Sequence, residues 1–159
     1  MESFNQLNSQ LVNENVYAIL PDKEGSILLG TLSALVSFNP EKRSFTTIDK
    51  EKDGTPFTSQ RITILFRDSR KRLWIGGEEG ISVFQQEGIE IEKAPILPES
   101  SVTKMFTNCI YEAANGIIWV GTREGFYCFN EKEKKIKRYT TANGLPNNVV
   151  YGILEDTFG

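Results

Sequence analysis

The chain has 159 residues, 39% of them hydrophobic and 25% charged, with a formal net charge of −3. These values are typical of a soluble globular domain, and without a basic stripe they argue against a nucleic-acid-binding surface. The chain contains no histidine, which excludes Ser–His or Cys–His nucleophilic catalysis and most zinc sites.

In chain order, the sequence divides into units of similar length. A glycine at the end of a β-rich segment recurs at Gly30, Gly76 and Gly121, at spacings of 46 and 45 residues. An aromatic column, consisting of Phe38, Phe84 and Phe129, keeps the same two spacings. Repeats of roughly 40 to 50 residues with strand character are typical of β-propeller blades.

Each full unit is predicted to contain four short antiparallel strands. The predicted strands are 16–20, 26–30, 35–39 and 44–49, then 62–67, 72–76, 81–85 and 89–93, then 106–111, 117–121, 126–130 and 135–140. The turn signals between them include Asn115-Gly116, which favours a tight hairpin. The predicted fold is therefore all-β, a partial β-propeller of about three and a half four-stranded antiparallel blades.

The predicted domain is a single partial propeller that spans residues 1–159. Its parts are 1–15, the outer strand of a preceding blade; 16–61, blade 1; 62–105, blade 2; 106–148, blade 3; and 149–159, the inner strand of an unfinished blade 4. Closed propellers have 4 to 8 blades, so this number of strands is too small to close a ring. At each open end of the partial propeller, one sheet is therefore expected to expose an apolar face that a further sheet would bury.

Two repeated columns are predicted to be structural. Trp74 and Trp119 lie in the middle of equivalent strands between apolar neighbours, and Leu28 holds the same place in the first unit. Packing between blades is favoured over sugar stacking, because aromatic side chains bury large areas at such interfaces. Asp22 and Asp68 share a column before a turn, where a carboxylate accepts hydrogen bonds from turn amides. Asp156 belongs to the same column.

The loops at one end of the predicted blades carry the candidate ligand-binding residues. A meander of four strands places the loop that precedes each inner strand at the same end as the loop between the second and third strands. Polar side chains in these loops are predicted to converge at the mouth of the central channel, where loops on a rigid scaffold often bind ligands. The candidates are Arg61, Glu78, Asn108, Arg123 and Asn148.

Three motifs resemble the two-component regulator propeller repeat. They are residues 118–126 (Ile-Trp-Val-Gly-Thr-Arg-Glu-Gly-Phe), 143–149 (Asn-Gly-Leu-Pro-Asn-Asn-Val) and 153–156 (Ile-Leu-Glu-Asp). The resemblance implies a periplasmic sensor region of a bacterial hybrid two-component system, with oligosaccharide ligands and a histidine kinase further along the parent protein. The first residues of this chain carry no export signal of their own, so the periplasmic location is expected only as part of such a parent.

The predicted function is ligand recognition without catalysis, by a sensor fragment that detects carbohydrate. A carbohydrate-active enzyme on a propeller scaffold remains an alternative and would need a close pair of carboxylates in one channel. A scaffold that binds proteins through its loops is a second alternative. No cofactor and no metal are expected.

The expected partners follow from the open ends of the predicted propeller. An oligosaccharide is the expected ligand. A second copy of the chain, or further blades of a longer parent chain, would cover the exposed sheet faces. No nucleic acid is expected, and no membrane insertion, because no apolar run approaches the ~18 residues of a spanning helix.

Overall fold

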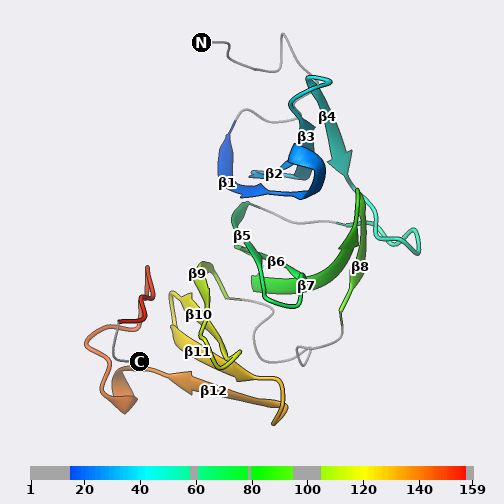
Figure 1. The fold of residues 1–159 in the computed structure, drawn as a ribbon. Helices are drawn as coiled ribbons and strands as arrows, with labels where there is room; N and C mark the ends of the chain where they lie inside the picture. Colours follow the sequence, from blue (N-terminus) through cyan, green and yellow to red (C-terminus); the bar gives the residue numbers. More distant parts are fainter. Residues whose placement is uncertain (1–14, 58–60, 79, 95–104, 157–159) are drawn as a thin grey trace.

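The computed structural model describes residues 15–57, 61–78, 80–94 and 105–156, which form three four-stranded antiparallel sheets (Figure 1). Sheet 1 contains β1 (Val16–Pro21), β2 (Ile27–Thr31), β3 (Leu35–Asn39) and β4 (Ser44–Ile48). Sheet 2 contains β5 (Ile62–Arg67), β6 (Leu73–Gly77), β7 (Gly80–Glu87) and β8 (Glu90–Lys93). Sheet 3 contains β9 (Thr107–Glu112), β10 (Ile118–Thr122), β11 (Gly125–Asn130) and β12 (Lys135–Tyr139). Two short 3₁₀ turns, η1 (Lys23–Gly25) and η2 (Thr141–Asn143), complete the described elements.

The all-β prediction is confirmed. Both ends of each of the twelve predicted strands fall within two residues of the ends of an observed strand. In every sheet the strand order follows the chain order, as in a simple meander. The three sheets do not close into a ring, and the number of blades stays a prediction. The predicted outer strand at 1–15 falls almost wholly outside the described residues. Within the described ranges, no helix has the length and apolar character needed to cross a bilayer.

The first strands of the sheets lie next to one another. β5 contacts β1 and β2, and β9 contacts β5 and β6. In Figure 1, β1, β5 and β9 follow one another along one side of the molecule, whereas β4 and β8 lie on the other. This arrangement agrees with a propeller in which the first strand of each sheet is the inner one.

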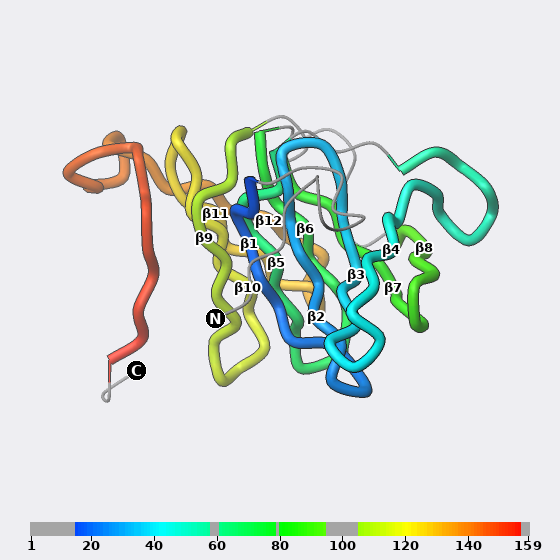
Figure 2. Tube along the Cα trace, turned by 90° about the horizontal axis from the view of Figure 1, so that it is seen from above, coloured from blue at the N-terminus to red at the C-terminus, as the bar shows by residue number. Residues whose placement is uncertain are grey.

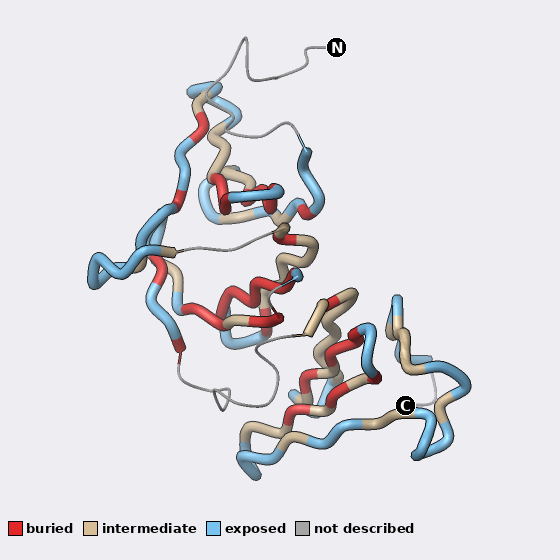
Figure 3. Tube along the Cα trace, turned by 180° about the vertical axis from the view of Figure 1, so that it is seen from behind, coloured by how far each residue is buried: buried red, intermediate tan, exposed pale blue. Residues whose placement is uncertain are grey.

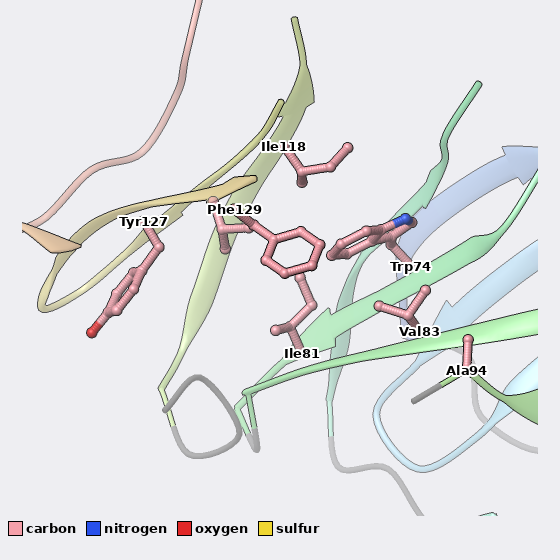
Figure 4. Close-up of a cluster of buried hydrophobic side chains, with 8 residues drawn as sticks. Trp74, Ile81, Val83, Ala94, Ile118, Tyr127 and Phe129 are labelled. Atoms are coloured by element: carbon pink, nitrogen blue, oxygen red, sulfur yellow. The ribbon is translucent and has the colours of Figure 1, made fainter. Parts of the chain in front are cut away.

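The core lies between the sheets, where the buried segments of neighbouring sheets face each other (Figure 3). Leu28 is fully buried between sheets 1 and 2, in a cluster with Leu73 and Phe84. Trp74 is fully buried between sheets 2 and 3, and its ring meets Phe129 edge to face at 6.2 Å (Figure 4). Packing between sheets, as predicted for this column, is confirmed at Leu28 and Trp74.

Trp119 has a different environment, because it lies on the face of sheet 3 that points away from sheet 2. Its ring is partly exposed and stacks on Phe126 at 5.3 Å. Phe126 in turn stacks on Tyr139 at 5.0 Å. The prediction that Trp119 packs between blades therefore stays open, because the described structure places no further sheet against this face.

The glycine column marks the places where one sheet touches the first strand of the next. A Cβ atom on Gly30 would lie 2.8 Å from the carbonyl oxygen of Ile62. On Gly76 it would lie 2.9 Å from the Cγ2 of Thr107. On Gly121 it would lie 3.1 Å from a carbonyl oxygen in the segment after sheet 3. Only a residue without a side chain allows this close approach.

We expect Gly30→Ala to lower the free energy of unfolding by about 2 kcal/mol, because the added methyl group forces apart two packed backbones. Gly152→Ala is the matched control, since a Cβ atom there would meet no atom within 4 Å. Urea unfolding followed by tryptophan fluorescence measures both. Equal effects of the two substitutions would show that the close approach at Gly30 does not constrain the sheets.

The segment 149–156 differs from the prediction, because the structure assigns no strand to it. The N–H of Val150 donates to the carbonyl of Thr122 at 2.9 Å, and the Val150 carbonyl accepts a bond from the Asn108 side chain at 3.0 Å. Val150 meets Gly121 as Ile62 meets Gly30, so the segment begins where an inner strand would lie. A strand also needs a ladder partner, and the described residues provide none for this segment.

Candidate functional site

The candidate site is the end of the sheets at which the first strands begin, called the mouth below. It comprises residues 15–17, 61–63 and 105–108, together with the turns 31–34, 77–78 and 122–125 that join the second and third strands. These segments share one end because the start of each first strand pairs with the end of the second, as Val16 does with Thr31. Several of these turns are visible along one edge of the sheets in Figure 2.

Each first strand has a register shift at the mouth. The pairing skips Tyr17 in β1, Thr63 in β5 and Asn108 in β9, so each of these residues is extra relative to its partner strand. Such bulges redirect a side chain and are common beside functional sites. These bulges could not be predicted from the sequence, because an extra residue in every unit leaves the repeat spacing unchanged.

The redirected side chains have different roles. Thr63 donates from its hydroxyl to the carbonyl oxygen of Thr107 at 3.1 Å, which joins β5 to β9. Asn108 bonds to the segment after sheet 3 in the equivalent way. Tyr17 is 43% exposed and was not among the predicted residues. The predicted candidate Asn108 thus supports the neighbouring backbone, whereas Tyr17 presents its ring to solvent.

Arg61 and Glu78, both predicted candidates, form an ion pair of 2.9 Å with side chains 39% and 40% exposed. The guanidinium carbon of Arg61 lies 5.6 Å from the centre of the Tyr17 ring, and its backbone N–H donates to the carbonyl of Leu32 at 2.7 Å. Arg61 therefore joins sheet 1 to sheet 2. It does so with a φ of 44°, a left-handed conformation that few residues other than glycine adopt.

The other two candidates occupy different places. Arg123 is exposed, and its guanidinium carbon lies 3.8 Å from the centre of the Phe106 ring. Asn148 accepts a hydrogen bond from the backbone N–H of Thr141 at 2.8 Å, which holds the loop after β12. The structure thus pairs Arg61 with Glu78, places Arg123 at the mouth of the next sheet, and gives both asparagines contacts with the backbone.

A second polar network lies at the opposite end of the sheets. The buried carboxylate of Asp68 accepts bonds from the backbone N–H groups of Arg70 and Arg72, from Arg72 Nε at 2.6 Å and from Trp74 Nε1 at 2.8 Å. Arg72 also pairs with Glu131 of sheet 3 at 2.9 Å. Burial acts to lower the pKa of Arg72, but its bonds to the two carboxylates outweigh this and raise the pKa. The structural role predicted for Asp68 is confirmed.

Asp22, from the same column, makes different contacts. Its carboxylate accepts bonds from Arg67 at 3.0 Å and from Gln86 at 2.7 Å, both of which belong to sheet 2. It therefore links two sheets through side chains. The described residues contain no group of three or more acidic, cysteine or histidine side chains that could hold a metal ion.

Comparison with known proteins identifies the repeat. The family model described as two component regulator propeller matches residues 56–79 and 99–124. These two segments resemble the two-component regulator propeller repeat. The expected resemblance is thereby confirmed, although the matched segments cover only part of the chain.

The proteins that match this chain are much longer than it is. It is 28% identical over 161 residues to histidine kinase P4 of Formosa agariphila, which corresponds to 96% of this chain and 12% of the relative. It resembles the extracellular domain of the putative hybrid two component system BT4673 from B. thetaiotaomicron with a TM-score of 0.75 at 21% identity, over 97% of this chain and 21% of that one. The equivalent domain of BT3049 matches with a TM-score of 0.75 at 22% identity, over 100% and 22%.

Proposed function

We propose that the chain is part of the ligand-recognition region of a two-component sensor, that it binds an oligosaccharide at its mouth, and that it does not act as a catalyst. The repeat family and the histidine kinase relative support the signalling role. The extracellular location of the two solved relatives supports a periplasmic position for the parent protein. The observation that carries the proposal is the cluster of Tyr17, Arg61 and Glu78 at the mouth.

This cluster has the chemistry that sugar recognition requires. The apolar face of a sugar ring packs on an exposed aromatic side chain such as Tyr17. Sugar hydroxyls both donate and accept hydrogen bonds, so they can engage the guanidinium donors of Arg61 and the carboxylate of Glu78.

The enzyme alternative requires two carboxylates that act on one bond. The mouth carboxylates Glu78 and Glu124 belong to turns of different sheets. Each forms an ion pair with an arginine, Glu78 with Arg61 at 2.9 Å and Glu124 with Arg138 at 3.5 Å. Their placement favours binding over cleavage.

The test is binding of the full chain to an oligosaccharide panel by isothermal titration calorimetry, together with a reducing-sugar assay. We expect saturable binding without release of reducing ends. Tyr17→Ala should weaken binding about tenfold, whereas the control Ile89→Ala, at a residue 54% exposed in the turn between β7 and β8 at the opposite end of the sheets, should not. Release of reducing ends would favour the enzyme alternative, and absence of binding across the panel would refute the proposal.

The outer face of sheet 3 leads to a proposal about partners. A groove of about 490 Å³ runs along this face and is lined by Tyr111, Trp119, Phe126 and Leu154, among others. Since the equivalent Trp74 is buried by the next sheet, we propose that another four-stranded sheet covers this face. A second copy or further blades of a longer parent would supply it. Light scattering of the full chain separates a dimer from a monomer.

A further inference from the structure

Most arginines that the structure describes pair with a carboxylate, including Arg61 and Arg138 near the mouth. Those at the end opposite the mouth are neutralised across the sheet junctions, as Arg67 is by Asp22 and Arg72 by Asp68 and Glu131. At the mouth, by contrast, Arg123 forms no ion pair with any described residue. The described charges of the mouth balance, with Arg61 and Arg123 against Glu78 and Glu124, but Glu78 and Glu124 pair with Arg61 and Arg138 and leave Arg123 without a carboxylate partner among the described residues.

Arg61 and Arg123 lie at the starts of neighbouring first strands. Arg61 directly precedes β5, and Arg123 lies over the ring of Phe106, which directly precedes β9. The hydrogen bond from Thr63 to the carbonyl of Thr107 joins these two strand starts. The guanidinium of Arg61 faces Tyr17 of sheet 1, and that of Arg123 faces Phe106 at the start of sheet 3, so both lie at the mouth, at neighbouring strand starts.

Both guanidinium groups are held in place by other groups of the chain. Each lies near an aromatic ring, at 5.6 Å for Arg61 and 3.8 Å for Arg123. The backbone N–H of Arg123 also donates to the Phe106 carbonyl at 3.3 Å. Arg61 is further fixed in a left-handed backbone conformation, a kind of strain that clusters at ligand-binding positions. A guanidinium held in this way loses little freedom when it binds an anion.

We propose that the mouth recognises the carboxylate groups of an acidic oligosaccharide, and that Arg123 and Arg61 are its specificity-determining residues. This inference rests on the proposed function and specifies its ligand. The planar guanidinium fork matches a carboxylate with two parallel hydrogen bonds. Arg123 binds a ligand carboxylate without losing an ion pair. Arg61 binds a ligand carboxylate when that group replaces the half-exposed carboxylate of Glu78 in its ion pair.

The experiment compares two ligands of the same length with the full chain by calorimetry. One is a trimer of galacturonic acid, and the other is its fully methyl-esterified form, which keeps the sugar rings but carries no charge. We expect the acid to bind at least about tenfold more tightly, with an affinity that falls as salt is raised from 50 to about 500 mM. Arg123→Gln should weaken binding of the acid about tenfold and leave the ester unaffected.

Two further variants sharpen the comparison. Lys132→Gln removes one positive charge from the exposed turn between β11 and β12, at the end opposite the mouth, and should change neither affinity. Glu78→Gln should tighten binding of the acid, because it frees Arg61. If acid and ester bind equally well and Arg123→Gln changes neither affinity, the charge preference is wrong while the sensor proposal stands. If only neutral oligosaccharides bind, the inference about acidic ligands is wrong and the proposed function stands. If no saccharide binds, the proposed function is refuted as well.

Discussion

Trp74→Ala is expected to lower the free energy of unfolding by about 3–5 kcal/mol, the usual loss when a large aromatic side chain is removed from a core. The indole ring is fully buried between sheets 2 and 3, where it contacts Phe129. Its Nε1–H also donates to the buried carboxylate of Asp68 at 2.8 Å. The substitution therefore leaves a cavity at a sheet junction and removes one donor from a buried carboxylate. Urea unfolding monitored by circular dichroism measures the loss.

Trp119→Ala is the matched comparison, because Trp119 occupies the same repeat position on the outer face of sheet 3. Its partly exposed ring packs on Phe126 and Tyr139 of its own sheet, so its removal should cost clearly less in the isolated chain. Trp74→Phe keeps a buried ring and loses only the hydrogen bond and some volume, so its effect should fall between the two. Equal losses for Trp74→Ala and Trp119→Ala would contradict the assignment of the core to the sheet junctions.

The repeat and its strands could be predicted from the sequence, because both depend on local patterns. Strand positions follow from alternation and turn residues. The glycine column was found as a pattern, but its cause is the close approach of the next sheet, as between Gly30 and Ile62. Such a contact between units becomes visible only when the units are placed in space.

The mouth was predicted less well, because its residues depend on the bulges and on neighbouring sheets. The repeat position of Asn108 placed it at the mouth, but only the structure shows that its amide holds the segment at Val150. Tyr17 was overlooked because a tyrosine near the start of a strand looks like an ordinary strand residue. Arg61 precedes β5 and Glu78 follows β6, so both lie at the open end of the β5–β6 hairpin. The sequence placed both residues at the mouth but left their ion pair undetermined.

The aspartate column shows how equivalent positions take different roles. Asp22 and Asp68 are both predicted to bind turn amides, but only Asp68 does so in the structure. The carboxylate of Asp68 faces the turn and two buried donors, whereas that of Asp22 faces Arg67 and Gln86 of the next sheet. The two positions are therefore expected to differ in their contribution to stability.

We expect Asp68→Ala to lower the free energy of unfolding by about 3–5 kcal/mol, because it leaves the Arg72 guanidinium, only 7% exposed, without its nearest carboxylate. It also removes the acceptor from the Trp74 indole and from two backbone N–H groups. Asp22→Ala should cost less, about 1–2 kcal/mol, since the released Arg67 side chain is 22% exposed and keeps its bond to Gln86. Both losses are measured by urea unfolding.

A second substitution separates the charge effect from the loss of packing. Arg72→Met removes the buried guanidinium, and replacing a buried ion pair by apolar side chains is often nearly neutral. The double variant Asp68→Ala/Arg72→Met should therefore lose less than the sum of the two single variants, with a coupling of about 1–3 kcal/mol. Additive losses would mean that Arg72 is satisfied by Glu131 alone.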